Sequence, residues 1–183
     1  LFIFCIACNS LCMGQLPHTF TQYTSEDGLA QKTIQGIMQD HKGVMWFATW
    51  DGLYKFDGYT FKNYKAHPGD SIGLSNNRLD NIKEDKYGYI WVGTEYGLSK
   101  FDGYRFTNYL HNEEDTTSIT DNIISDLLVD KKGNLWIGCA KGLMRYNYET
   151  NHFTRLQFPD GRKPRIYSMV ESHNGDILLG TAG

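Results

Sequence analysis

The chain has 183 residues, a net charge of −3, 19 glycines and an aromatic content of 14%. It has no block of lysine and arginine, so nucleic acid is not an expected partner of this segment. Three of its four cysteines lie in the first 14 residues, and the fourth, Cys139, is expected to be a small buried residue, so a disulfide framework is excluded.

Residues 1–14, LFIFCIACNSLCMG, carry no charge and are mostly apolar. This run is too short for a membrane-spanning helix and is typical of the apolar part of a secretory signal peptide. A buried apolar strand is the alternative, and a lipoprotein cysteine at Cys8 or Cys12 fits the flanking residues poorly. We therefore predict a partial signal peptide that exports the rest of the chain.

Residues 15–33 contain the run Phe20-Thr21-Gln22-Tyr23, which resembles two later runs at 61–64 and 106–109. Those later runs are expected to be the outer strands of repeated sheets. A lone outer strand ahead of the first repeat predicts a closing strand that completes a sheet formed at the far end of the chain, because such closure removes an exposed edge. The remainder of 15–33 is expected to be a loop that leads into the first repeat.

From residue 34 the chain repeats itself with a step of 45 residues, and a weaker fourth copy at 172–183 has Leu178 in place of tryptophan. A period of 40–50 residues indicates a propeller or a solenoid. The recurring residues are Asp40, Asp85 and Asp130; Gly43, Gly88 and Gly133; Trp46, Trp91 and Trp136; Gly52, Gly97 and Gly142.

Each repeat predicts four short strands, which in the first copy are 34–40, 44–49, 53–56 and 59–64. The strands are rich in β-branched and aromatic residues, and Asp-Gly pairs between them are strong hairpin signals. The fold class is therefore all-β, a β-propeller of four-stranded antiparallel blades that is incomplete here, with about three and a half blades plus the closing strand. The predicted blades are 34–65, 78–109, 123–156 and, in part, 165–183.

The recurring residues are interpreted as architecture. The aspartate and glycine of D-x-x-G form the first turn of each blade, and the tryptophan packs between neighbouring blades. The small pair that follows, such as Gly93-Thr94 or Gly138-Cys139, allows close approach of adjacent blades. A residue that recurs in every blade serves what every blade needs, which is turning and packing.

Catalysis and metal binding find little support. The repeated aspartates lie at equivalent corners of separate blades, so they are not expected to pair at the roughly 5–10 Å that glycosidases need. The six histidines lack metal-ligand spacing, and no calcium-binding loop occurs. We predict no catalytic residue, no metal site and no cofactor.

Ligand binding is expected on one face. In a four-stranded blade, the turn between the second and third strands and the loop to the next blade emerge on the same side. The long loops on that side are 66–77 and 111–122, and long loops on a rigid scaffold concentrate function. The turn residues beside them differ between blades: Trp50, Asp51, Glu95, Tyr96 and Lys141.

Trp50 and Tyr96 could stack on a sugar ring, while Asp51, Glu95 and Lys141 could bind hydroxyl groups or a uronate. Two alternatives stay open. These side chains could merely solvate a rim, or the ligand pocket could use later blades.

The pattern D-x-x-G-x-[LIM]-W-[IVF]-[GA]-T-x-x-G-L-x-[KR]-[FY], as in DKYGYIWVGTEYGLSKF at 85–101, resembles the two-component regulator propeller repeat. The run FTQYTSEDGLAQ at 20–31 resembles the start of the mature sensor region in Bacteroides-type hybrid two-component systems. The third and fourth copies depart from the pattern at Cys139 and Leu178.

The resemblance implies the start of a periplasmic sensor that detects glycan-derived oligosaccharides as a homodimer. In that family two seven-bladed propellers and a β-sandwich precede a transmembrane helix, a histidine kinase and a receiver, so the remainder of the same chain is an implied partner. The fragment itself is not expected to be an enzyme. The alternatives are a non-catalytic propeller scaffold for protein contacts, and part of a secreted glycan-active enzyme.

Overall fold

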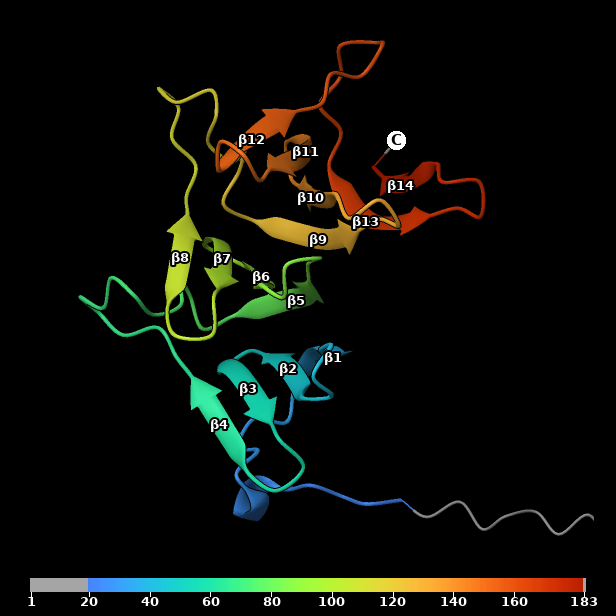
Figure 1. Cartoon of the computed structure of the whole chain (residues 1–183). Helices are drawn as coiled ribbons and strands as arrows, with labels where there is room; N and C mark the ends of the chain where they lie inside the picture. Colours follow the sequence, from blue (N-terminus) through green and yellow to red (C-terminus); the bar gives the residue numbers. More distant parts are fainter. Residues whose placement is uncertain (1–19, 183) are drawn as a thin grey trace, which may run out of the picture.

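A computed structural model describes residues 20–182, whose strands form four antiparallel sheets arranged one beside the next (Figure 1). The all-β fold class and the four-stranded blades are confirmed. The predicted signal segment 1–14 lies outside the described residues.

Within each sheet the strands follow one another in chain order, so every sheet is a simple meander. The first sheet contains β1 (Ile34–Gln39), β2 (Met45–Thr49), β3 (Gly52–Phe56) and β4 (Phe61–Tyr64). The second contains β5 (Leu79–Glu84), β6 (Ile90–Thr94), β7 (Gly97–Phe101) and β8 (Phe106–Tyr109). The third contains β9 (Ile124–Val129), β10 (Leu135–Cys139), β11 (Gly142–Asn147) and β12 (His152–Arg155). The fourth contains β13 (Ile166–Glu171) and β14 (Ile177–Thr181).

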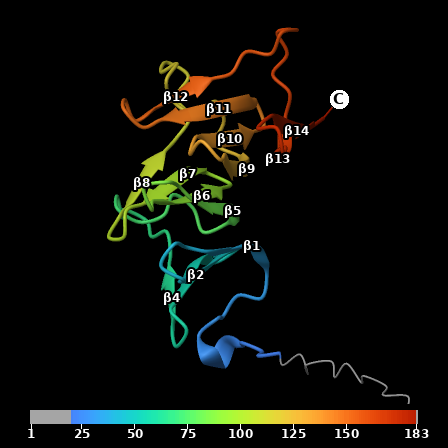
Figure 2. The ribbon, with the colours of Figure 1, turned by 45° about the vertical axis from the view of Figure 1, so that its right-hand side comes forward.

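The first strands of the sheets converge. β1 contacts β5, β5 contacts β9, and β9 contacts β13. In Figures 1 and 2 these strands lie toward one side of the stack, while β4, β8 and β12 lie toward the other. This is the radial arrangement of propeller blades, in which the first strand of each blade lies nearest the axis.

The segment before the first sheet forms no strand among residues 20–24, and a short 3₁₀ helix, η1 (Ser25–Asp27), follows. The ring of Tyr23 packs edge-on against Phe56 and Phe61, with centroid distances of 5.0 and 5.6 Å. The closing-strand role of this segment stays a prediction, since the strands it would join are not among the described residues.

Each repeated aspartate ties its turn to its tryptophan. One oxygen of the Asp85 carboxylate accepts the amide hydrogens of Tyr87 and Tyr89 at 2.9 and 3.0 Å, and the other accepts the indole N–H of Trp91 at 2.7 Å. Asp40 and Asp130 hold their own tryptophans in the same way, at 2.8 and 2.9 Å. One buried acceptor therefore satisfies both the turn amides and the indole donor.

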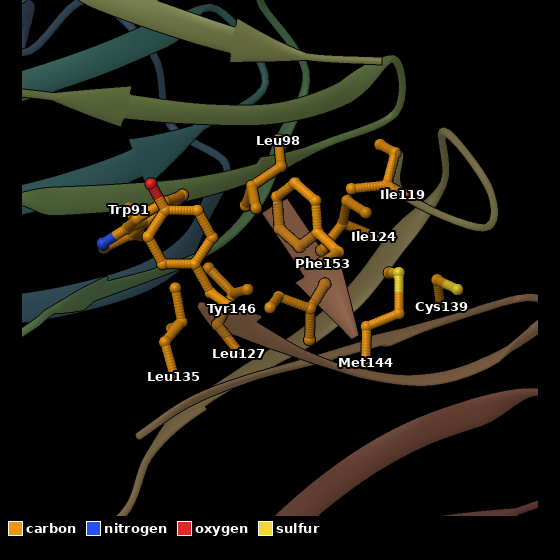
Figure 3. Packing of buried hydrophobic residues seen from close by; sticks show 11 residues of the cluster. Trp91, Leu98, Ile119, Ile124, Leu127, Leu135, Cys139, Met144, Tyr146 and Phe153 are labelled. Carbon is orange, nitrogen blue, oxygen red and sulfur yellow. The ribbon is translucent and has the colours of Figure 1, made fainter. Parts of the chain in front are cut away.

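The largest core lies between the second and third sheets (Figure 3). The Trp91 side chain is fully buried, and the Tyr146 ring meets it edge-on at 4.6 Å between centroids. Phe153 packs against Tyr146 at 5.3 Å. Burial of each such side chain stabilises the fold by about 1.5–3 kcal/mol, so this seam is a major source of stability.

The small residues of the repeat lie where neighbouring sheets approach most closely. A Cβ added to Gly93 would lie 2.9 Å from the side chain of Ile124, and one added to Gly138 would lie 2.7 Å from Ile166. Both isoleucines begin the first strand of the next sheet. At these positions a larger side chain would force adjacent blades apart.

Candidate functional site

The turns between the second and third strands share one hydrogen-bond pattern. The hydroxyl of Thr49 donates to the carbonyl of Gly52 at 2.8 Å and accepts the amide hydrogen of Asp51 at 3.0 Å. Thr94 makes the same two contacts with Gly97 and Tyr96, both at 2.9 Å. The threonine fixes the turn, so the two side chains between it and the glycine are free to vary.

The third turn uses Cys139 in place of threonine. Its Sγ lies 3.4 Å from the Gly142 carbonyl and 2.9 Å from the Thr120 hydroxyl, and the residue is fully buried. Burial raises the pKa of this thiol, which keeps it protonated and unreactive. The expectation of a small buried residue is confirmed.

Two of the predicted ligand-binding residues meet through a third residue. The guanidinium of Arg78 lies 4.9 Å from the ring centre of Trp50, and its Nη2 lies 3.1 Å from a carboxylate oxygen of Glu95. Burial raises the pKa of the nearby Asp80, and the charge of Glu95 adds to this effect while Arg78 opposes it. An aromatic ring, a cation and two carboxyl groups thus gather between the first two blades.

Arg78 was missed from sequence. It is half-exposed and stands just before β5, where the preceding copy has Thr33 and the following copy Ile123. A change of residue type at a repeat-equivalent position next to the turns was the signal that could have identified it.

Asp51 lies apart from this cluster. Its carboxylate pairs with the ammonium group of Lys65 at 2.6 Å. Exposed pairs of this kind contribute little to stability, yet the pairing occupies the oxygen that was predicted to bind a ligand. A ligand would have to compete with Lys65 for it.

Tyr96 borders a hollow of about 530 Å³ beneath the 66–77 loop. Tyr96 is 52% exposed, so its side chain is accessible to a ligand. Its lining combines apolar side chains with uncharged polar ones such as Ser75 and Asn108, and Asp70 is the acidic residue among them. This hollow suits an uncharged hydroxyl-rich ligand.

Lys141 borders a second hollow, of about 470 Å³, between the 111–122 loop and residues 156–163. Its ammonium group lies 3.7 Å from the carboxylate of Asp121. The five predicted residues therefore separate into four places: Trp50 lies with Glu95, Tyr96 borders one hollow, Lys141 borders another, and Asp51 is paired with Lys65.

The first strand of every sheet also contains a β-bulge at its second residue, which sequence reasoning missed. The strand pairing skips one residue there, and the skipped residues are Gln35, Asp80, Ser125 and Tyr167. Bulges redirect side chains and recur beside functional sites. These four residues differ in chemistry, which makes the inner rim of the same face variable as well.

Within the described residues, no group of three or more His, Cys, Asp or Glu side chains is placed to hold a metal ion. Residues 20–182 also include no helix with the length and apolar character needed to span a membrane.

The sequence profile of the two component regulator propeller matches residues 28–51, 73–96 and 118–141. Three stretches of this chain are therefore similar to the two component regulator propeller repeat. Each matched range covers a first strand, the D-x-x-G turn and the second strand with the turn that follows. These repeats therefore contain both the structural aspartate–tryptophan pair and the variable turn residues.

The chain is similar to a solved extracellular domain and to a histidine kinase. One is the extracellular domain of a B. thetaiotaomicron protein described as a hybrid two component system, with 26% identity and a TM-score of 0.76 over 87% of this chain and 23% of that chain. Histidine kinase P4 of Formosa agariphila is 47% identical over 55 residues, which are 30% of this chain and 4% of the kinase.

A more distant match shows the fold alone. Virginiamycin B lyase from Staphylococcus aureus is 14% identical, with a TM-score of 0.56 over 78% of this chain and 47% of that chain. The chain therefore spans less than a quarter of the extracellular domain it resembles and about half of the lyase.

Proposed function

We propose that this chain is part of the extracytoplasmic sensor region of a hybrid two-component system, on the periplasmic side of the membrane. The observation that carries the proposal is the similarity to the extracellular sensor domain, at 26% identity over 87% of the chain. The activity of the whole protein belongs to the proposal, because the chain spans 23% of that domain. The expected output is control of transcription through a histidine kinase and a phosphorelay.

The ligand is a glycan-derived oligosaccharide, bound on the face that carries the variable turns. Trp50 and Tyr96, 44% and 52% exposed, offer rings for stacking against sugars. Arg78 and Glu95 offer a donor and an acceptor for hydroxyl groups between them. The rigid blades hold these groups at fixed separations, so little conformational entropy is lost on binding.

Signalling requires that the ligand bind one conformation of the sensor more tightly than another. A ligand that bridges loops of neighbouring blades does this when the blades or the two copies of a homodimer change their relative position. The coupling between the outer site and the kinase is then the ratio of the two affinities. No catalytic step in this segment is needed.

The test uses the intact protein with a panel of glycan digests, and measures thermal stabilisation in vitro and reporter transcription in the native host. Tyr96→Ala and Trp50→Ala should weaken binding of an active oligosaccharide by about tenfold or more, as expected when a stacking contact is lost. Tyr104→Ala is the matched control, because Tyr104 is 94% exposed in a turn between third and fourth strands, on the opposite face.

Equal effects of all three substitutions would contradict the assignment of the binding face. A protein that no oligosaccharide stabilises or activates, but that copurifies with a stable protein partner, would be a scaffold instead.

A further inference from the structure

The hollow beside Lys141 differs in charge from the rest of the molecule. Its lining includes four basic side chains, Lys141, Arg155, Arg162 and Lys163, and one acidic side chain, Glu113. The whole chain has a net charge of −3, so a basic hollow reverses the average sign. Fields inside concave surfaces are focused, which strengthens attraction of a charged ligand.

Two of the basic groups have acidic partners and two do not. Lys141 pairs with Asp121 at 3.7 Å and Arg162 with Asp160 at 2.6 Å. Among the described residues, no carboxylate forms an ion pair with Arg155 or Lys163. The positive charge of these two side chains is therefore available to a ligand.

Arg155 is held in place in the wall of the hollow. Its Nη2 donates to the backbone carbonyls of Asp115 and Ser118 at 3.1 and 3.3 Å, which holds the 111–122 loop over the hollow. Its Nε is buried and has no hydrogen-bond partner. Because Arg155 is tied to this loop and has no carboxylate partner among the described residues, it places a fixed positive charge in the wall of the hollow.

The apolar part of the lining suits a sugar ring. Leu143, Leu156 and Phe158 lie in the same hollow as the basic groups, and Phe158 is half-buried. A volume of about 470 Å³ lies in the range of small-ligand sites, roughly 300–1,000 Å³. The other hollow, beside Tyr96, has no lysine or arginine in its lining, so the two hollows differ in the ligand chemistry they favour.

We propose that the hollow formed by Lys141, Arg155, Phe158 and Lys163 binds an acidic oligosaccharide, one that carries carboxylate or sulfate groups. The anionic group lies against the guanidinium of Arg155 and the ammonium group of Lys163, neither of which has an ion-pair partner among the described residues, and the face of a sugar ring lies against Phe158. This inference rests on the proposed function and assigns a second hollow, on the same face, to an acidic ligand.

The test measures binding by calorimetry to the intact protein, with tetragalacturonate as the carboxylate probe and a carrageenan tetrasaccharide as the sulfate probe. Cellotetraose is the uncharged probe, and inorganic sulfate tests whether charge alone is sufficient. The variant is Arg162→Gln/Lys163→Gln, which removes two charges from exposed positions without touching the loop contacts of Arg155. The matched control is Lys42→Gln/Lys132→Gln, which removes two exposed charges on the opposite face.

The proposal expects at least one acidic tetrasaccharide to bind and the 162/163 variant to weaken its binding by about tenfold, the scale of one charge-assisted contact. The control pair should change it less than about twofold, and added salt should weaken it. The acidic probe that binds identifies carboxylate or sulfate as the recognised group.

Unchanged binding in the 162/163 variant, or equal binding of inorganic sulfate alone, would overturn the proposal. If only cellotetraose binds, and Tyr96→Ala abolishes that binding, the inference is wrong and the proposed function stands. If no oligosaccharide of any kind binds or activates transcription, the proposed function fails with it.

Discussion

Replacing Asp85 with alanine tests whether the repeated aspartate is a structural residue. The Asp85 side chain is 5% exposed and accepts three hydrogen bonds, and its partner Trp91 is fully buried. The substitution leaves the indole N–H without an acceptor, which costs about 1–3 kcal/mol, and removes two turn bonds worth about 0.5–1 kcal/mol each once water replaces them. We expect a loss of about 3 kcal/mol in the free energy of unfolding.

The matched control is Asp102→Ala. Asp102 caps an exposed turn, where its carboxylate accepts the amide hydrogens of Tyr104 and Arg105 at 2.9 Å each, and no tryptophan depends on it. Its loss should be about 1 kcal/mol. Urea unfolding followed by tryptophan fluorescence measures both, provided that the denaturant slopes of the two variants agree. Equal losses for Asp85→Ala and Asp102→Ala would refute the structural role of the aspartate–tryptophan contact.

Three further predictions concern the same framework. Gly138→Ala should lower the free energy of unfolding by about 1–3 kcal/mol, because the new methyl group would overlap an isoleucine of the next sheet. Gly36→Ala is the control and should cost less, because its new methyl group would lie 3.3 Å from its nearest neighbour. Urea midpoints that fall equally in the two variants would contradict this prediction. Cys139→Thr should raise the free energy of unfolding by a few tenths to about 1 kcal/mol, since a hydroxyl donates a stronger hydrogen bond to the turn carbonyl than a thiol does. A lower urea midpoint in this variant would count against the prediction. Burial acts to raise the pKa of Asp40 and Asp130, but hydrogen bonds from the turn amides and the tryptophan indoles outweigh it and leave each pKa lowered. The stabilisation that the two ionised carboxylates provide is therefore complete above the unfolded-state pKa of about 4 and is lost as pH falls through the lower folded-state pKa. Melting temperatures measured between pH 7 and pH 2.5 should show this loss. The double variant Asp40→Asn/Asp130→Asn should flatten the dependence of melting temperature on pH.

The positions of the strands and turns were predictable because the sequence signals for them are local. The Asp-x-x-Gly turns recur in the first three copies, Asp-Gly pairs mark further turns in the first two, and the stretches between are rich in β-branched and aromatic residues, so each strand could be located from its own neighbours. Agreement between copies then removed the ambiguity that a single short strand leaves. The four-stranded sheets that begin at Ile34, Leu79 and Ile124 follow from this repetition.

The candidate ligand-binding face was less predictable, because its chemistry depends largely on contacts between copies of the repeat. Arg78 lies between Trp50 and Glu95 only when two blades are packed side by side. The pairing of Asp51 with Lys65 lies within one copy, yet it joins a turn to the residue after β4, 14 positions away in the chain. The bulges in the first strands depend on sheet registration, which no pattern of residue types specified.

The threonine-locked turn has an evolutionary consequence. Since the hydroxyls of Thr49 and Thr94 hold their turns from beneath, mutation of the two exposed residues in each turn carries almost no penalty in folding. Selection can therefore change the specificity of one blade at a time while the others keep theirs. Gene duplication of such a unit supplies both a ready-made structural module and a fresh pair of positions that are free to diverge.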